Sequence, residues 1–308
     1  MRLIRGLHNL RPDHHGSALT IGNFDGLHRG HQAVLARLRE RADELGLPTT
    51  VMTFEPTAQE YFSPATAPAR LQRLRDKLTV LRGLDVDQVL CLRFDRRLAA
   101  LSAGDFVERI LVQGLAVRYL VVGDDFRFGK GRSGDFGFLR EAGRQAGFEV
   151  VNTSTFYHDD DRVSSTRIRT ALTEGDFGTA AHMLGRPYRV CGRVAPGHQR
   201  GRTIGFHTAN IRLHRLVSPL QGVFAVRVFG LGEQAVNGVA NIGTRPTVDG
   251  SDFVLEVHLF DFDRDIYGRY LDVEFCRKLR DEKKFDSFEL LRQQISLDAE
   301  QARRYFSE

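Results

Sequence analysis

Two histidines, His28 and His31, flank a glycine in the segment GNFDGLHRGH, which follows a short apolar run from Ala18 to Ile21. The apolar run predicts a strand that ends at Gly22, and the residues from about His31 toward Leu45 have the spacing of an amphipathic helix. Backbone N–H groups and the helix dipole favour anions at such a helix start. Two imidazoles there can donate to phosphate oxygens and stabilise the extra charge of a transition state. For HxGH alone, a polar helix start with two exposed histidines is the competing interpretation.

A second polar cluster lies in the segment VSSTRIRTAL, where Ser164, Ser165 and Thr166 precede Arg169. Hydroxyls and N–H groups at a helix start, with a guanidinium nearby, can hold a triphosphate and neutralise a leaving pyrophosphate. An ordinary helix cap is the alternative, because Ser and Thr often supply one.

Two further segments carry aromatic rings beside turn-forming residues. The first is FEPTAQEYF, which ends at Phe62, and the second is GDDFRFGKGRSGDF, which contains Asp125, Phe126 and Phe128. Aromatic side chains in such a setting can stack on a flat ring such as isoalloxazine or adenine. A surface loop with an aromatic anchor is the alternative for either segment taken alone.

The second half of the chain has its own group of candidate residues. Its glycine-rich basic part, which is suited to approach phosphates, consists of Gly197, Arg200, Gly201 and Arg202. Thr208 and Asn210 follow, and they offer two neutral oxygens of the kind that hold Mg²⁺ beside nucleotide phosphates. Glu256 begins a later strand, where it either faces a pocket or is an exposed strand carboxylate.

The elements that must position these residues alternate between strand and helix in the first half. Strands are expected over 18–21, 49–54, 89–94, 119–122 and 149–151, and helices over 31–45, 70–84 and 102–115. Strands separated by helices favour a parallel sheet with right-handed crossovers, a Rossmann-like doubly wound α/β domain. Ligands bind such sheets beyond the carboxyl ends of the strands. The loops that begin at Gly22, Phe54, Phe94 and Gly123 are expected at that edge.

The pattern changes after Gly185 and Pro187, which break the chain. Short strand candidates follow over 189–194, 222–229, 234–242, 253–259 and 271–279, and they predict a compact antiparallel barrel. Asp286, with Glu289 three residues on, predicts the capped start of a final helix. The expected domains are therefore residues 1–186 and 187–308.

Composition limits the class of protein. The 308 residues are 42% hydrophobic and 27% charged, which suits globular domains with real cores, and their number suggests two domains. The net charge of +5 suits anionic ligands, but basic residues alternate with acidic ones, so no nucleic-acid partner is expected. Cys91, Cys191 and Cys276 form no CxxC pair, and no apolar run approaches a membrane span. We therefore expect a cytoplasmic protein without a membrane partner.

GNFDGLHRGH and SSTRIR together resemble the HxGH nucleotidyltransferases, most closely the adenylyltransferase half of the bacterial bifunctional riboflavin kinase/FAD synthetase family. The second half resembles the riboflavin kinase module of that family in GRTIGFHTANI, GVANIGTRPTV and LEVHLFDFDRDIYG. The resemblance implies an HxGH domain followed by a small antiparallel Greek-key β-barrel with a C-terminal helix. It also implies phosphorylation of riboflavin by ATP to FMN, and adenylylation of FMN by a second ATP to FAD with release of pyrophosphate.

The resemblance completes the assignment of roles. His28, His31 and Arg169 are expected to stabilise charge during adenylyl transfer, and Glu256 is expected to be the base for the ribityl hydroxyl. The expected ATP-binding residues are Gly22, Asn23, Phe24, Asp25, His28, His31, Ser164, Ser165, Thr166, Arg169, Gly197, Arg200, Gly201 and Arg202. Flavin binding is expected at Phe62, Asp125, Phe126 and Phe128, and Mg²⁺ binding at Thr208 and Asn210. The expected partners are riboflavin, FMN and ATP, for a monomer or weak homo-oligomer.

One residue departs from the family pattern. The family has proline in the segment PTAN, whereas His207 stands before Thr208 here. Proline would fix φ and remove an N–H, and histidine restores both freedoms and adds a titratable ring. A less preorganised kinase pocket leaves one alternative open, an FMN adenylyltransferase with a degenerate barrel. A second alternative, of another class, is a barrel that binds or senses flavin without catalysis.

Overall fold

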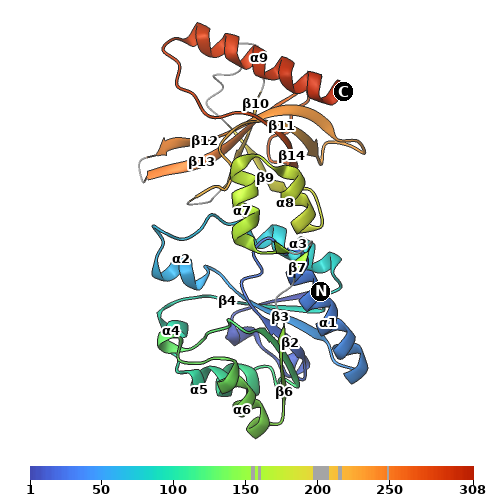
Figure 1. The fold of residues 1–308 in the computed structure, drawn as a ribbon, viewed down its shortest axis with the longest axis vertical. Helices are drawn as coiled ribbons and strands as arrows, with labels where there is room; N and C mark the ends of the chain where they lie inside the picture. The colour runs from blue at the N-terminus through green and yellow to red at the C-terminus, as the bar shows by residue number, and fades with distance from the viewer. Residues whose placement is uncertain (154–156, 159–160, 197–207, 214–216, 248–249) are drawn as a thin grey trace. The chain divides into compact units, whose positions relative to one another are not determined.

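The computed structural model describes residues 1–153, 157–158, 161–196, 208–213, 217–247 and 250–308. They form two compact units (Figure 1). The first comprises Met1–Ala67 and Arg73–Ser164, and the second comprises Pro68–Gln72 and Ser165–Glu308. The second unit therefore includes residues that precede Pro187, where the sequence pattern changes.

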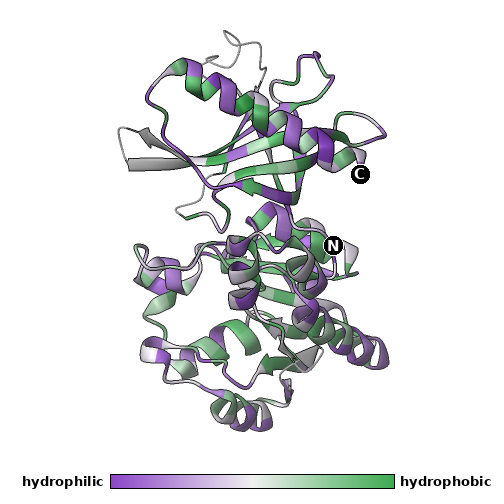
Figure 2. Cartoon of the chain, turned by 45° about the horizontal axis from the view of Figure 1, so that its top comes forward, coloured by the Kyte–Doolittle hydropathy of each residue, from purple (hydrophilic) through white to green (hydrophobic). Residues whose placement is uncertain are grey.

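The first unit is built on a six-stranded parallel sheet. In order across the sheet, its strands are β1 (Arg2–Arg5), β4 (Gln88–Leu92), β3 (Thr49–Phe54), β2 (Ala18–Ile21), β5 (Tyr119–Gly123) and β6 (Glu149–Thr153). Every neighbouring pair is parallel. The central strands are buried and largely hydrophobic (Figure 2), as expected for a parallel sheet covered on both faces. The Rossmann-like architecture is thus confirmed.

Helices cover both faces of this sheet. On one face lie α1 (Arg29–Leu45) and α3 (Leu74–Gly83), whose leucines share a core with Val51. On the other lie α5 (Ala103–Phe106), which continues to Val112, and α6 (Phe136–Ala146); their apolar residues share a core with Leu120. The remaining short elements of the unit are α2 (Ala58–Phe62), α4 (Arg96–Ala99), the turns Leu7–Asn9, Pro12–His14 and Lys130–Arg132, and the strands β7 (Tyr157–His158) and β8 (Asp161–Arg162).

The order of the strands reverses between β2 and β5. From β2 the chain continues to β3 and β4 on one side of the sheet, and β5 and β6 lie on the other side. In doubly wound sheets the ligand crevice lies at this reversal, beyond the carboxyl ends of the two strands. The loops that follow Ile21 and Gly123 flank this point.

The second unit contains a closed antiparallel barrel. Around it run β10 (Thr208–Arg212), β13 (Gly250–Leu259), β12 (Val236–Thr247), β11 (Gly222–Phe229), β14 (Tyr270–Arg280) and β9 (Arg189–Ala195), which pairs again with β10. Strands β11 to β13 follow one another, and β14 returns to pair with β11, so the connection is a Greek key. The predicted barrel is confirmed, and β10 is a strand that the sequence pattern did not predict.

Buried aromatic rings pack against one another in the second unit. The rings of Phe224 and Phe275 lie 5.3 Å apart between centroids. Helix α8 (Phe177–Leu184), which follows α7 (Ser165–Glu174), contributes Phe177 at 5.9 Å from Phe224. Edge-to-face contacts of this kind stabilise the packing beyond their buried area. Helix α8 is therefore part of the barrel core.

Helix α9 (Phe288–Ser307) covers part of the outer face of the barrel. Its Ala299 and Ala302 are buried in one cluster with Val223, and Figure 2 shows hydrophobic and hydrophilic residues mixed along the helix. The expected cap at Asp286 is wrong. Ser287 takes the extended cap conformation instead, and its hydroxyl accepts the N–H of Leu290 at 3.2 Å, so the helix starts one residue later.

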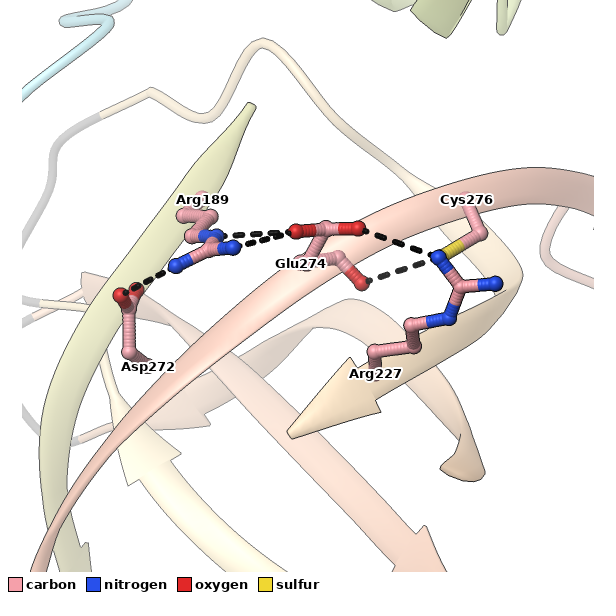
Figure 3. Close-up of polar contacts among 5 residues, drawn as sticks. All are labelled: Arg189, Arg227, Asp272, Glu274 and Cys276. Carbon is pink, nitrogen blue, oxygen red and sulfur yellow. Dashed lines mark hydrogen bonds and ion pairs between the residues drawn. The ribbon is translucent and has the colours of Figure 1, made fainter. Parts of the chain in front are cut away.

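An ion-pair network joins three neighbouring strands of the barrel (Figure 3). Arg189 of β9 donates to one Glu274 oxygen of β14 through Nε at 2.9 Å and through its terminal nitrogen at 2.7 Å. Arg227 of β11 lies 3.7 Å from the other Glu274 oxygen, and Arg189 lies 3.5 Å from Asp272. Burial, with the nearby Glu274 charge, raises the pKa of the Cys276 thiol. The network ties β9, β14 and β11 together.

Candidate active sites

The loop after β2 holds an unusual backbone conformation. Phe24 and Leu27 have positive φ angles of 47° and 43°, which are unfavourable for residues with large side chains. Both side chains are buried, and Gly26, at φ 84°, takes a conformation that glycine adopts without a side-chain clash. The loop is thus anchored by its apolar residues. In this loop Asn23 is exposed, and the loop ends at His28, where α1 begins.

His28 and His31 form a stacked pair at the start of α1. His28 is the cap residue, and its Nδ1 accepts the backbone N–H of His31 at 3.4 Å. Their ring centroids are 3.7 Å apart, and their planes are inclined by 17°. The ring of Phe24 lies 5.1 Å from that of His31. The structure therefore brings together the expected residues of the GNFDGLHRGH segment at the crevice edge of the sheet.

His31 is held in its neutral form. Burial, followed by electrostatic interaction with His28 and with Lys77, lowers the pKa of His31 well below 6.5. Its Nδ1 is buried and has no hydrogen-bond partner among the described residues. A buried ring nitrogen without a partner is unfavourable, so a ligand that supplies one would be stabilised.

Lys77 of α3 is a polar residue near these histidines that sequence reasoning missed. Its Nζ donates to the carbonyl of Asn23 at 2.6 Å and to Oγ1 of Thr53 at 3.5 Å. It is only 4% exposed. The signal was present in the sequence, because Lys77 falls one turn from both Leu74 and Leu81, inside the apolar stripe of the helix.

The expected flavin-binding residues occupy two different environments. Phe62, at the end of α2, is 65% exposed, and its ring lies 5.6 Å from that of Phe94. Asp125 is also exposed, just after β5. Phe126 is half-buried and stacks at 5.5 Å on Phe128, which is part of the hydrophobic core. The structure thus gives Phe128 a packing role, and Phe62 offers the most accessible of these rings.

The SSTRIR segment lies at the division between the units. Ser164 is the last residue of the first unit, and Ser165 begins α7 in the second. Thr166 is exposed, and Arg169 is half-buried on the same helix. Within the second unit, Nε of Arg169 donates to the carbonyl of Ala69 at 2.5 Å. This contact holds residues 68–72 against α7.

A row of polar residues crosses the barrel. Glu256 of β13 lies directly opposite Asn210 of β10 on one side and Asn241 of β12 on the other. Asn241 in turn lies opposite Val223, which packs against α9, so the row is on the outer face of the barrel. Thr208, two residues before Asn210, points to the same face. The expected base and the expected metal ligands therefore share one surface.

The side chain of Asn210 suits a cation. It is 8% exposed, and its Oδ1 is buried without a hydrogen-bond partner among the described residues. A neutral amide oxygen in that state fits a hard cation such as Mg²⁺. The other expected residues of this loop, Gly197, Arg200, Gly201 and Arg202, lie outside the described residues, as does His207.

Two family models match the chain. One is described as FAD synthetase and matches residues 10–167, and the other is described as riboflavin kinase and matches residues 184–306. The described part of the chain includes no helix that is both long and apolar enough to cross a membrane.

Curated relatives match along the whole chain. A bifunctional riboflavin kinase/FMN adenylyltransferase of Haemophilus influenzae is 52% identical over 307 residues, which cover 100% of both chains. One of Pseudomonas fluorescens is 54% identical over 304 residues, 98% of this chain and 97% of the relative. A crystal structure described as a macrolide-efflux protein from Streptococcus pneumoniae is similar with a TM-score of 0.78 and 30% identity, covering 98% of this chain and 99% of that one.

Proposed function

Because the chain belongs to the family of bifunctional riboflavin kinases/FMN adenylyltransferases, we infer that it performs both reactions. It phosphorylates riboflavin with ATP to give FMN, and it joins FMN to the AMP part of a second ATP to give FAD and pyrophosphate. The observation that carries this conclusion is the 52% identity to a bifunctional relative over the full length of both chains. Both family models match in the expected order along the chain.

The alternative of a degenerate or non-catalytic barrel is not favoured. The riboflavin kinase model matches the second half from residue 184 to residue 306. Thr208, Asn210 and Glu256 also lie on one face of the barrel, where a metal-binding pair beside a carboxylate suits phosphoryl transfer. A module that only binds flavin has no need of that combination.

Adenylyl transfer is a single displacement. A phosphate oxygen of FMN attacks the α-phosphorus of ATP, a new P–O bond forms, and the bond to pyrophosphate breaks. We assign His28 and His31 to stabilise the charge that develops on the α-phosphate oxygens. Their position at the N-terminus of α1 supports this assignment, because the helix dipole favours the same charge. Ser164, Ser165, Thr166 and Arg169 remain predicted ligands of the ATP phosphates.

Phosphorylation of riboflavin transfers the γ-phosphoryl group of ATP to the ribityl hydroxyl, and the bond from the γ-phosphorus to the bridging oxygen breaks so that ADP leaves. We assign Glu256 as the base that accepts the hydroxyl proton as the new P–O bond forms. Thr208 and Asn210 would hold Mg²⁺, which when bound neutralises charge on the nucleotide phosphates. The buried, unpartnered Oδ1 of Asn210 supports this assignment.

We propose that residues 1–186 carry the adenylyltransferase and residues 187–308 the kinase. We further propose a cytoplasmic enzyme, monomeric or weakly self-associating, that binds neither nucleic acid nor membranes. The near balance of 44 basic and 39 acidic residues supports the absence of a nucleic-acid partner.

One experiment tests both activities. The purified chain is incubated with riboflavin, ATP and Mg²⁺, and riboflavin, FMN and FAD are separated by chromatography over time. FMN should form first and FAD should follow. A parallel incubation contains FMN in place of riboflavin. Accumulation of FMN without FAD would remove the adenylyltransferase, and conversion of added FMN to FAD without any use of riboflavin would remove the kinase.

A further inference from the structure

Lys77 is a buried cation in the first unit, close to the paired histidines. It is 4% exposed and lies within the apolar stripe of α3. An ammonium group is unfavourable in such surroundings unless hydrogen bonds replace its hydration. Methionine or leucine would fill the same position without that cost. A lysine there therefore needs a reason other than packing.

The partners of Lys77 supply that reason. Its Nζ donates to the backbone carbonyl of Asn23 at 2.6 Å, in the loop that connects β2 to α1. The next residue, Phe24, has a φ of 47°, and Leu27 has a φ of 43°. Backbone conformations of this kind persist only when their surroundings impose them. Lys77 restrains the loop from the side of α3, in addition to the burial of the two apolar side chains.

The same ammonium group acts on His31. After burial and the neighbouring His28, the charge of Lys77 is the third cause that lowers the pKa of His31. A neutral His31 keeps one ring nitrogen as a donor and the other as an acceptor. Lys77 thus influences both the backbone that leads to the histidines and the protonation state of one of them.

We propose that Lys77 is a positioning residue of the adenylyl-transfer site. Its ammonium group holds the loop from Gly22 to Leu27, and through that loop it holds His28 and His31, in the arrangement that stabilises the transition state. Lys77 acts through these groups and has no need to touch ATP or FMN. The inference rests on the proposed adenylyltransferase activity of this unit and extends its machinery to α3.

The test uses the full chain with Lys77→Met, which keeps the length of the side chain and removes its charge and donors. The kcat for FAD formation from FMN and ATP should fall about 10- to 100-fold, the usual effect of small misplacements of catalytic groups. The KM values for ATP and FMN should change less than about threefold, because the lost interaction acts mainly in the transition state. Riboflavin phosphorylation by the same chain should be unchanged. Lys77→Arg, which keeps the charge and donors, should restore much of the lost kcat.

The matched control is Arg82→Met, which removes one positive charge from the exposed side of the same helix. It should leave both activities within about twofold of the parent, since exposed charges interact weakly. If Lys77→Met does not fold, Lys77→Gln takes its place with the same expected split. A kcat near that of the parent, a loss confined to KM, or a loss that matches the unfolded fraction overturns the proposal. A parent chain that forms no FAD would instead count against the proposed function.

Discussion

The imidazole rings of His28 and His31 stack 3.7 Å apart at the first turn of α1. Their spacing of three residues places them on the same side of the helix start, one above the other. Two positive charges so close would repel each other, and the neighbouring Lys77 adds to that repulsion. The free protein is thus arranged to hold His31 neutral, and an anionic ligand at this helix start would favour protonation of the ring.

Replacing either histidine by alanine should slow FAD formation from FMN by about a hundredfold or more, because each removes a donor to the transition state. The measurement is the initial rate of FAD appearance with saturating ATP and FMN. His8→Ala is the matched control, since His8 is an exposed histidine of the same unit. Riboflavin phosphorylation should persist in all three variants, and unchanged FAD synthesis in both site variants would remove these residues from the mechanism.

The low pKa of His31 makes stability depend on pH. As the pH falls below 6.5, the unfolded chain takes up a proton at this ring and the folded protein does not, so the free energy of unfolding decreases. This ring contributes a slope of at most about 1.4 kcal/mol per pH unit, the value for one proton. Urea unfolding of the parent and of His31→Gln at several pH values measures it. Equal slopes in the two proteins would contradict the assignment.

Glu256→Gln should lower FMN production by roughly two to four orders of magnitude, the range for loss of a general base. The substitution keeps the size and hydrogen bonding of the side chain but removes its basicity. FAD formation from added FMN should continue, which provides an internal control. Glu233→Gln changes an exposed carboxylate of the same unit and should leave the kinase unaffected. FMN production near the parent rate would make Glu256 a simple strand carboxylate.

Two fragments test where the kinase unit begins. A fragment from Ser165 to Glu308 keeps α8 and the contact of Phe177 with Phe224, and a fragment from Pro187 lacks them. Loss of a buried phenylalanine costs about 3–5 kcal/mol, so the shorter fragment should melt at a lower temperature or fail to fold. Circular dichroism during heating measures the difference. Phe177→Ala in the longer fragment should reproduce much of it, and equal stability of the two fragments would show that α8 is dispensable.

The network around Glu274 predicts a difference between two neighbouring carboxylates. Glu274→Ala should destabilise the second unit by about 1.5–3 kcal/mol, because it removes the two charge-assisted hydrogen bonds from Arg189 to a carboxylate that is largely buried. Asp272→Ala removes a longer and more exposed contact, and should cost less than about 1 kcal/mol. Urea unfolding of the full chain, followed by loss of riboflavin phosphorylation, compares the two. A larger effect at Asp272 would contradict the assignment.

Elements with a clear local pattern could be predicted from the sequence, and elements without one could not. The predicted strand over 49–54 has the same bounds as the strand Thr49–Phe54, because its residues are mostly buried and β-branched. The strand Arg2–Arg5 was missed, since four residues at the edge of a sheet, with only Ile4 buried, show no usable pattern. Helix α3 begins at Leu74 rather than Arg70, because residues 68–72 belong to the second unit, a long-range fact that local spacing does not contain.

The site was predictable where residues cluster in sequence. GNFDGLHRGH is contiguous, so its histidines and the helix start could be placed together. The juxtaposition of Asn210, Glu256 and Asn241 depends on the register of three strands, which only the folded barrel reveals. Local sequence therefore does not indicate Asn241, although it lies beside the expected base. The signal for Lys77 is ambiguous, because a lysine in an apolar stripe can equally be a surface residue at the edge of that stripe.

The inclusion of residues 68–72 in the second unit has a consequence for folding during translation. Their carbonyls at Ala69 and Leu71 accept hydrogen bonds from Arg169 and Tyr188, which follow them by 100 and 117 residues. On the ribosome this short stretch of the nascent chain emerges long before the residues it contacts. The sheet of the first unit can be complete once Ser164 has been translated, whereas the second unit must recruit a segment already outside the exit tunnel. We therefore expect the two units to mature in order, with the parallel sheet first and the barrel last.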